Sequence, residues 1–194
     1  MKKPTSNKTL HKLSAETGIQ KVTEVLFQFP DREFSLSDLA TEAGVAKANI
    51  SKILDELHKL DFIEITKLTN IWRIKANIQS WHFRKSKIVR NLNVIYKSGV
   101  VDFLNDHYNN PKSVILFGSF RNGEDISTSD ADIAIETDST DKYKVIELRQ
   151  LAGYEAIVGR AIQIHLFNRR NVDINVFNNI ANGIVLSGFL EVKP

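Results

Sequence analysis

The sequence contains no cysteine, a single methionine and only four prolines among its 194 residues. Without cysteine the chain has neither a disulfide framework nor a thiolate zinc site, which is typical of proteins in a reducing compartment. No apolar run approaches the roughly 20 residues that a membrane-spanning helix requires. The basic first residues also lack the apolar centre of a secretory signal. We therefore expect a cytoplasmic protein with no membrane partner and a flexible basic tail over residues 1–15.

Acidic side chains are scarce in the first half of the chain and more abundant in the second. Residues 1–100 carry 17 basic and 10 acidic side chains, whereas residues 101–194 carry 9 and 13. A basic half favours a polyanionic partner, and an acidic half favours metal ions or carboxylate chemistry. An uneven solvated surface is the alternative explanation. The length suits two small domains, each with a modest core.

The first half begins with helical periodicity and ends with strand alternation. Apolar residues recur at three-residue and four-residue spacing over 19–29, and Pro30 ends this helix. Ser37 is the expected cap of a short second helix, and Gly44 supplies the turn into a third. After Leu60 the segments FIEIT and IWRIK alternate around KLTN, which predicts a two-stranded hairpin.

This order of helices, glycine turn and hairpin resembles the winged helix-turn-helix over residues 16–78. In that family the second helix of the pair enters the DNA major groove and the wing touches the backbone. The resemblance implies double-stranded DNA as a partner, and a homodimer because such domains often pair on two-fold sites. Winged helices also serve as protein-docking modules, and that alternative stays open. The DNA-binding candidates are Lys47, Asn49, Ser51 and Lys52 on the helix and Lys67, Asn70 and Arg73 on the wing.

A basic helix is expected to connect the two halves over residues 79–98. Ile88, Leu92 and Ile95 form its packing stripe. Its exposed basic residues could extend a phosphate footprint, but packing between domains is the more common role of such a helix.

The second half places two carboxylates close to a glycine turn. Val114–Phe117 form an apolar strand that Gly118 and Ser119 turn sharply into a polar segment. Asp130 and Asp132 then begin a second apolar run, so both side chains point the same way on a strand. Their charges repel each other unless a cation lies between them, and hard carboxylate oxygens suit Mg²⁺.

The Gly118-Ser119 turn, ten intervening residues and Asp130-x-Asp132 resemble the signature of the polymerase-beta-like nucleotidyltransferases, particularly the minimal members, over residues 99–194. The resemblance implies a mixed sheet flanked by helices, so the whole chain is expected to be α/β (α+β). It also implies Mg²⁺ or Mn²⁺ held by Asp130 and Asp132, and an NTP, with ATP favoured. The residues that it assigns to the nucleotide are Gly118, Ser119, Arg121 and Ser129.

The chain departs from that family at the third carboxylate of the neighbouring strand. The strand reads AIQIHLF, and its alternation turns Gln163 and His165 toward the aspartates. Gln163 can offer a carbonyl oxygen and His165 can act as a base, so both join Asp130 and Asp132 as catalytic candidates. Losing an anionic ligand weakens metal binding. Residues 144–157 are expected to form a helix before this strand, and residues 174–181 another after it.

Two functions follow from these features. The first is a magnesium-dependent nucleotidyltransferase tethered to a DNA-binding domain, which moves a nucleoside monophosphate to a hydroxyl of an unknown acceptor. Minimal members often modify a ribonuclease toxin, so a protein acceptor of that kind is included by resemblance. The alternative is a DNA-binding transcriptional regulator whose transferase-like domain binds nucleotide or a partner without catalysis. A third and less specific hypothesis is a DNA-tethered scaffold with neither activity.

Overall fold

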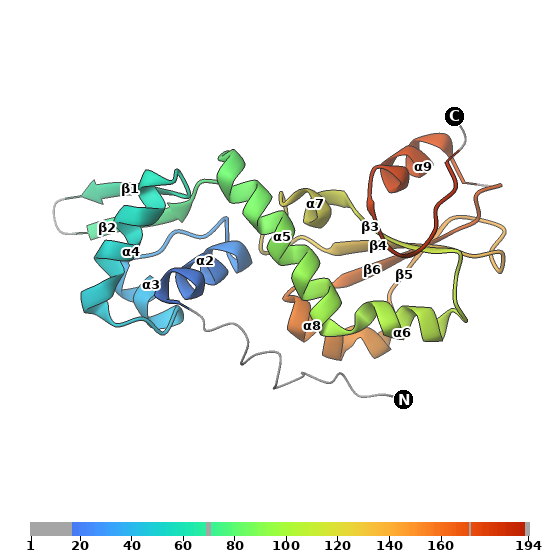
Figure 1. Cartoon of the computed structure of the whole chain (residues 1–194), viewed down its shortest axis with the longest axis horizontal. Helices are drawn as coiled ribbons and strands as arrows, with labels where there is room; N and C mark the ends of the chain where they lie inside the picture. The colour runs from blue at the N-terminus through green and yellow to red at the C-terminus, as the bar shows by residue number, and fades with distance from the viewer. Residues whose placement is uncertain (1–16, 69–70, 171, 193–194) are drawn as a thin grey trace. The chain divides into compact units, whose positions relative to one another are not determined.

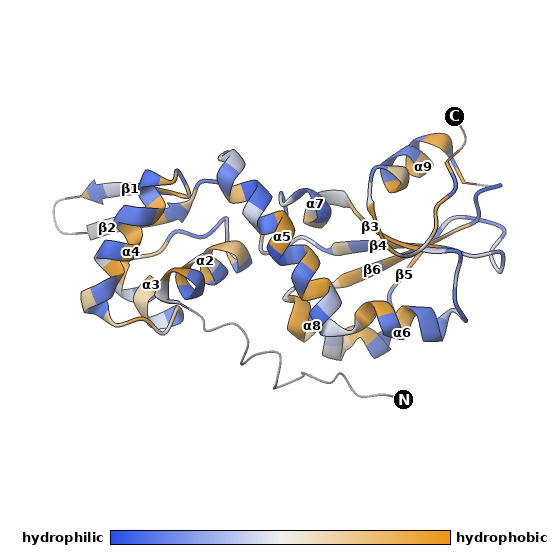
Figure 2. Ribbon diagram, in the orientation of Figure 1, coloured by the Kyte–Doolittle hydropathy of each residue, from blue (hydrophilic) through white to orange (hydrophobic). Residues whose placement is uncertain are grey.

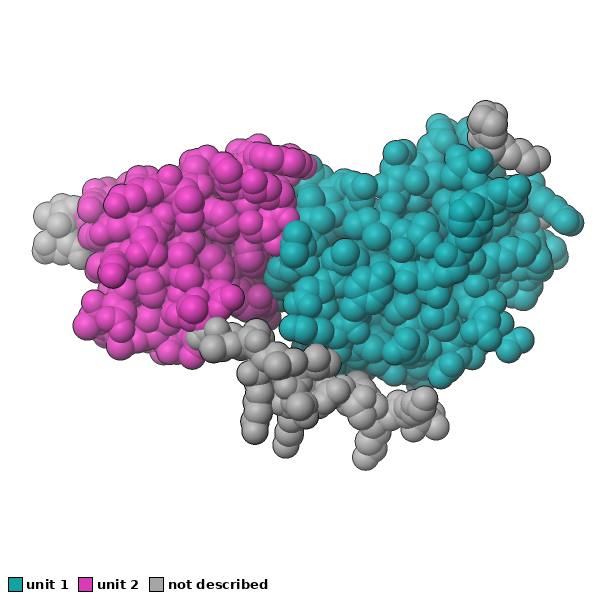
Figure 3. Space-filling model, viewed as in Figure 1, with its two compact units in different colours: residues 1–6, 88–194 teal, residues 7–87 magenta. Residues whose placement is uncertain are grey.

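The computed structural model describes residues 17–68, 71–170 and 172–192. They divide into two compact units, the first ending at Lys87 and the second beginning at Ile88 (Figure 3). The division falls within one continuous helix, α5 (Trp81–Ser98). The expected tail over residues 1–15 and the wing candidate Asn70 lie outside the described residues. Within these ranges, no helix has both the length and the apolar character needed to cross a membrane.

The first unit is a winged helix-turn-helix, with three helices followed by an antiparallel hairpin (Figure 1). Short helices need local caps because their first N–H groups lack partners. Thr17 and Gln20 form a capping box at the first helix. The elements are α2 (Gly18–Gln28), α3 (Leu36–Glu42), α4 (Lys47–Lys59), β1 (Ile63–Leu68) and β2 (Ile71–Ala76).

The cap expected at Ser37 is wrong by two residues. Ser35 is the N-cap of α3, with an extended backbone, and its hydroxyl accepts the N–H of Asp38 at 3.1 Å. Ser37 lies inside the first turn, where its carbonyl accepts the hydroxyl of Thr41. Both serines precede apolar residues of the helix, so the spacing alone did not distinguish them.

The core of the first unit follows the periodicity of its sequence. Ile50, Leu54 and Leu57 turn one side of α4 inward, and Phe34 bridges to Ile74 beside them. Hydrophobic and hydrophilic residues accordingly alternate along α4 in Figure 2. The N-terminal half of α4 keeps its remaining side chains exposed.

The second unit is built on a five-stranded mixed sheet in the order β5-β6-β4-β3-β7. β4 and β6 run parallel, and the other neighbours are antiparallel. The strands are β3 (Ser113–Phe117), β4 (Ala131–Glu136), β5 (Lys144–Ile146), β6 (Ile162–Phe167) and β7 (Ile184–Gly188). The helices are α6 (Val100–His107), α7 (Gly118–Asn122), the 3-10 turn η1 (Arg149–Leu151), α8 (Ala152–Val158) and α9 (Ile174–Ala181).

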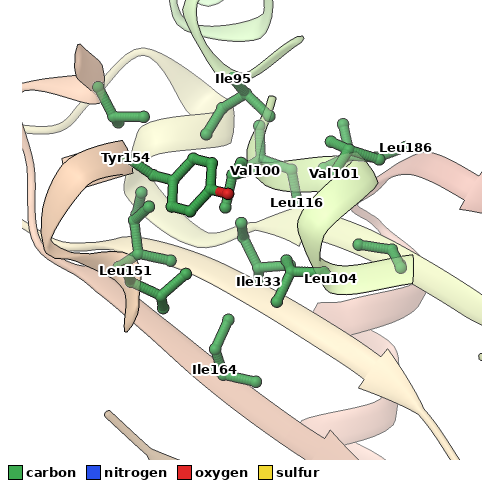
Figure 4. Packing of buried hydrophobic residues seen from close by; sticks show 14 of the residues in the cluster. Ile95, Val100, Val101, Leu104, Leu116, Ile133, Leu151, Tyr154, Ile164 and Leu186 are labelled. Carbon is green, nitrogen blue, oxygen red and sulfur yellow. The ribbon is translucent and has the colours of Figure 1, made fainter. Parts of the chain in front are cut away.

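Alternation along the strands gives the sheet two different faces. On one face, residues such as Leu116, Ile133 and Ile164 pack beneath α6, α8 and the second half of α5 (Figure 4). On the other face, Ile115 and Phe167 pack with α9. The polar residues of β4 and β6 alternate with the first set. They therefore lie on the face that carries α9.

The helix expected over residues 144–157 is wrong at its start. Lys144–Ile146 form β5, which pairs antiparallel with β6, and the helix α8 begins only at Ala152. Val145 and Ile146 are β-branched and suit a strand. The exposed edge of β6 supplies the hydrogen-bond partners that a sequence pattern does not reveal.

Candidate functional site

The glycine turn and the aspartate pair are brought into contact at the end of β3. Phe117, the last residue of β3, lies opposite Asp132 in the antiparallel ladder. Gly118 follows with φ of +74°, a backbone conformation that favours glycine. A Cβ at this position would collide with Oδ2 of Asp132. The absence of a side chain at Gly118 thus allows the carboxylate to pack against the start of α7.

Each aspartate receives one hydrogen bond from β6. Gln163 donates from Nε2 to Oδ2 of Asp130 at 2.7 Å. His165 Nε2 lies 3.0 Å from Oδ1 of Asp132. An ionised carboxylate only accepts hydrogen bonds, so Nε2 carries the hydrogen in this contact. The four catalytic candidates of the sequence therefore lie in two neighbouring hydrogen-bonded pairs between β6 and the start of β4.

His165 is fixed by two further rings. The hydroxyl of Tyr143 is hydrogen-bonded to Nδ1, and the edge of Phe117 packs with its centroid 4.8 Å from the imidazole. Burial raises the pKa of the Tyr143 phenol above its ordinary value, and the negative charge of Asp132 adds to the rise. Tyr143 consequently stays a hydroxyl over the neutral range. A neutral His165 ring accepts that hydroxyl at Nδ1 and donates from Nε2.

The residues expected to bind the nucleotide differ in the hydrogen bonds that they make. Ser119 lies in the first turn of α7, and its carbonyl accepts the N–H of Glu124 at 2.9 Å. Arg121 donates from Nη1 to Asn122, whereas its buried Nε has no hydrogen-bond partner among the residues that the structure describes. The hydroxyl of Ser129 accepts the N–H of Ile126 at 2.9 Å. Ser129 therefore shapes the loop before Asp130.

A polar hollow of about 390 Å³ opens beside Asp130. Hydroxyl groups and two carboxylates dominate its wall, which gives the aspartate access to a solute on one side. The lining residues are Ser127, Thr128, Ser129, Asp130, Glu155, Gly159, Arg160 and Ala161.

Among the described residues, Asp125, Asp173 and Glu136 are each held by partners other than the aspartate pair. Asp125 forms a buried ion pair with Arg160, with N···O of 3.0 Å and side chains 0% and 2% exposed. Asp173 caps α9 by accepting backbone N–H groups. Glu136 is buried at the far end of β4, where Arg169 donates to both of its oxygens. Across the described residues, no three His, Asp or Glu side chains gather in a metal-holding group.

The donor set that remains still fits a magnesium or manganese ion. Such ions are commonly held by one or two carboxylates, with water and substrate phosphates completing the shell. Asp130 and Asp132 supply two carboxylates on one face, and Asp132 adjoins the turn assigned to the phosphates. Gln163 offers its amide nitrogen to Asp130 in this arrangement, so its carbonyl is not the group facing that aspartate.

The helix candidates for DNA binding are all exposed. Lys47, Asn49, Ser51 and Lys52 lie at the N-terminal half of α4, outside the core of the first unit. Asn49 and Lys52 also border a hollow of about 360 Å³ whose wall is mainly apolar. Asp55 is exposed further along the same helix and adds one negative charge.

The wing candidates are less free than those on the helix. Lys67 in β1 places its Nζ 4.1 Å from the centroid of the Trp72 ring, a cation–π contact. Arg73 in β2 lies 3.8 Å from Glu33 in a loose, exposed ion pair. Asn70 lies outside the described residues.

Sequence reasoning missed Tyr143 and the ion pair of Asp125 with Arg160. Tyr143 directly precedes the segment that was expected to be helical, and its contact with His165 spans 22 residues. The ion pair spans 35 residues. A strand assignment for residues 144–146 would have indicated that Tyr143 lies beside β6.

The second unit has the site geometry expected of a polymerase-beta-like nucleotidyltransferase, and the first unit has the element order of a winged helix-turn-helix. Residues 99–188 match the family model for polymerase beta, nucleotidyltransferase. No curated protein matches the chain. A crystal structure of the adhesin competence repressor (AdcR) from Streptococcus pyogenes is similar at 16% identity and a TM-score of 0.37, over 52% of this chain and 75% of that one. That score is too low to bear on function.

Proposed function

We propose that the second unit transfers a nucleoside monophosphate from an NTP to a hydroxyl of an acceptor. The observation that carries the proposal is the contact of Gly118 with the carboxylate of Asp132. Both residues lie within the segment that matches the family model, and their contact supports a phosphate-binding turn next to metal-binding acids. ATP with Mg²⁺ or Mn²⁺ is the expected donor. A helical ribonuclease toxin is one acceptor that the family resemblance suggests.

The residues would act mainly by positioning and by charge. Asp130 and Asp132 would hold the cation, while Gly118 and Ser119 bring backbone and hydroxyl groups to the phosphates. Arg121 would add positive charge near them. When bound, Mg²⁺ supplies the charge that stabilises the transferred phosphoryl group. His165 would orient Asp132 through the hydrogen bond from Nε2.

The proposal is tested by incubating the protein with α-labelled NTPs, Mg²⁺ or Mn²⁺, and candidate acceptors. We expect Asp130→Asn and Asp132→Asn to lower label transfer roughly 100-fold or more, because a bound cation contributes several kcal/mol to the transition state. Asp138→Asn is the matched control, since Asp138 is exposed and pairs with Lys112 away from the site. Transfer that survives both site substitutions would disprove the assignment.

A second function, a DNA-binding regulator without catalysis, is favoured by the missing third carboxylate. In this case the transferase-like domain binds NTP or a partner, and no label reaches any acceptor. Both hypotheses share DNA binding through α4. We expect Lys47→Ala and Lys52→Ala to weaken DNA binding and to lower the salt slope by about one for each phosphate that the variant no longer neutralises.

Lys59→Ala serves as the control for DNA binding, because Lys59 is exposed at the other end of α4. Its affinity and salt slope are expected to match those of the wild type. If Lys47→Ala and Lys52→Ala bind DNA as the wild type does, α4 does not read DNA, and protein docking becomes the role of the first unit.

A further inference from the structure

The hydrogen bonds from β6 use one oxygen of each aspartate and leave the other. Gln163 occupies Oδ2 of Asp130, and His165 occupies Oδ1 of Asp132. In the parallel ladder Gln163 lies opposite Asp132, and His165 lies opposite Ala134. Both β6 side chains therefore reach back by two residues toward the start of β4. Oδ1 of Asp130 and Oδ2 of Asp132 accept no hydrogen bond from the described residues.

The two donors are not loose surface groups. The side chain of His165 is 9% exposed and is held by Tyr143 and Phe117, so its donor direction is set before any solute arrives. Gln163 is half-buried and makes a short contact to a carboxylate. Hydrogen bonds to an ionised acceptor are about twice as strong as neutral ones. They offset part of the repulsion between the two carboxylates.

We propose that Gln163 and His165 substitute for a resident cation, so that the protein folds with the repulsion of its aspartate pair partly offset by hydrogen bonds from β6. The site then takes one divalent cation, through Oδ1 of Asp130 and Oδ2 of Asp132, and holds it firmly only when NTP phosphates complete the shell. This inference rests on the proposed function, because it concerns the same aspartates. It differs from a site with a permanent metal pair, which would need further anionic oxygens.

Gln163→Glu is the variant that separates the two arrangements. Glutamate has nearly the shape of glutamine, but it replaces the donor to Asp130 with a third negative charge. With chelator present, we expect this variant to melt several degrees below the wild type, because three carboxylates then repel one another. Mn²⁺ should restore most of the stability and bind about tenfold more tightly than to the wild type.

The experiment measures melting temperature in chelator and in Mn²⁺, together with the number of Mn²⁺ ions bound per chain with and without a non-hydrolysable ATP analogue. The wild type should shift by less than about 2 °C with Mn²⁺ alone. It should bind one ion per chain when the analogue is present. Gln150→Glu is the control, since Gln150 is exposed in η1 and the charge change is the same. Gln163→Leu, which removes the donor without adding charge, should also melt lower in chelator.

Several results would overturn the inference. They are two Mn²⁺ ions per wild-type chain, a wild type that melts several degrees lower in chelator, or Gln163→Glu and Gln163→Leu that are as stable as Gln150→Glu. The label-transfer assay distinguishes this failure from failure of the proposed function. Transfer with two bound ions removes the inference alone. The expected metal behaviour without any transfer removes the transferase and leaves the inference standing.

Discussion

Among single residues, Gly118 and Gly99 form a matched pair for testing the site. Both have a left-handed backbone, with φ of +74° and +80°, but nothing lies within 4 Å of a Cβ added at Gly99. We expect Gly99→Ala to lower the free energy of unfolding by about 1–2 kcal/mol through backbone strain. Gly118→Ala should be destabilised further, because its Cβ would displace the carboxylate of Asp132. Urea denaturation and nucleotide binding measure the two effects.

One result of comparing Gly118→Ala with Gly99→Ala would contradict a role for the contact between Gly118 and Asp132. If Gly118→Ala and Gly99→Ala are destabilised equally and Gly118→Ala binds nucleotide normally, the contact with Asp132 has no bearing on the site. If nucleotide binding falls only in Gly118→Ala, the close approach of the turn to the aspartate is what the glycine provides.

Tyr143 should titrate at unusually high pH. Burial and then the charge of Asp132 raise its pKa above the ordinary value of 10.0. As pH rises, the unfolded chain therefore loses the Tyr143 proton before the folded chain does. The contribution of the protonated phenol to the free energy of unfolding is complete below about pH 10 and is lost as pH rises through the folded pKa. The difference in tyrosinate absorbance between the wild type and Tyr143→Phe isolates this group. A titration centred at or below pH 10 would contradict the burial of the hydroxyl beside Asp132.

The sequence pattern predicted which residues share the site, but it could not predict the contacts between them. Asp130 and Asp132 are two residues apart, and strand alternation alone predicts that Gln163 and His165 share a face. Which atom each side chain contacts depends on the register between β4 and β6, which no local pattern encodes. The hydroxyl of Tyr143 reaches His165 only because β5 pairs with β6, so this contact was not predictable.

Among the structural elements, the loop before β4 is held by a buried ion pair. Arg160 donates to Asp125, and Asn91 of α5 donates to the other oxygen of the same carboxylate at 2.9 Å. Breaking a buried ion pair by removal of one partner is strongly destabilising. We expect Arg160→Met to lower the free energy of unfolding by about 3–5 kcal/mol. Urea denaturation of the second unit provides the measurement.

Lys112→Met is the control for this prediction. Lys112 pairs with Asp138 at 2.7 Å, but the two side chains are 53% and 66% exposed. Exposed pairs contribute about 0–1 kcal/mol, so this variant should unfold close to the wild type. Equal effects of Arg160→Met and Lys112→Met would mean that the buried pair adds no more than a surface one.

Elements with strong local signals were predicted, and those that depend on distant partners were not. The apolar stripe of α4 and the alternation of β1 and β2 predicted the helix and the hairpin, and the structure contains both. The segment that became β5 is only three residues long, and it pairs with a strand about 20 residues further along. Such a short edge strand has no period of its own, so the neighbouring α8 dominated the pattern.

Over the whole molecule, the buried hydrophobic residues separate in the same way as the two units. One cluster contains only residues of the first unit, including Leu54, and the other two contain only residues of the second, including Leu116. Stability that comes from burial is therefore assigned to each unit separately. The chain passes from one unit to the other within helix α5.

Both tryptophans of the chain, Trp72 and Trp81, belong to the first unit, so tryptophan fluorescence reports on the unfolding of that unit. Leu54→Ala removes a fully buried side chain and should cost about 2–5 kcal/mol, which lowers the urea midpoint of tryptophan fluorescence. Leu116→Ala makes the same change in the second unit. It should leave the fluorescence midpoint unchanged. In far-ultraviolet circular dichroism, which reports on both units, the transition that belongs to the second unit should move to a lower urea concentration. If either variant moves both signals equally, the two units unfold together in one cooperative transition.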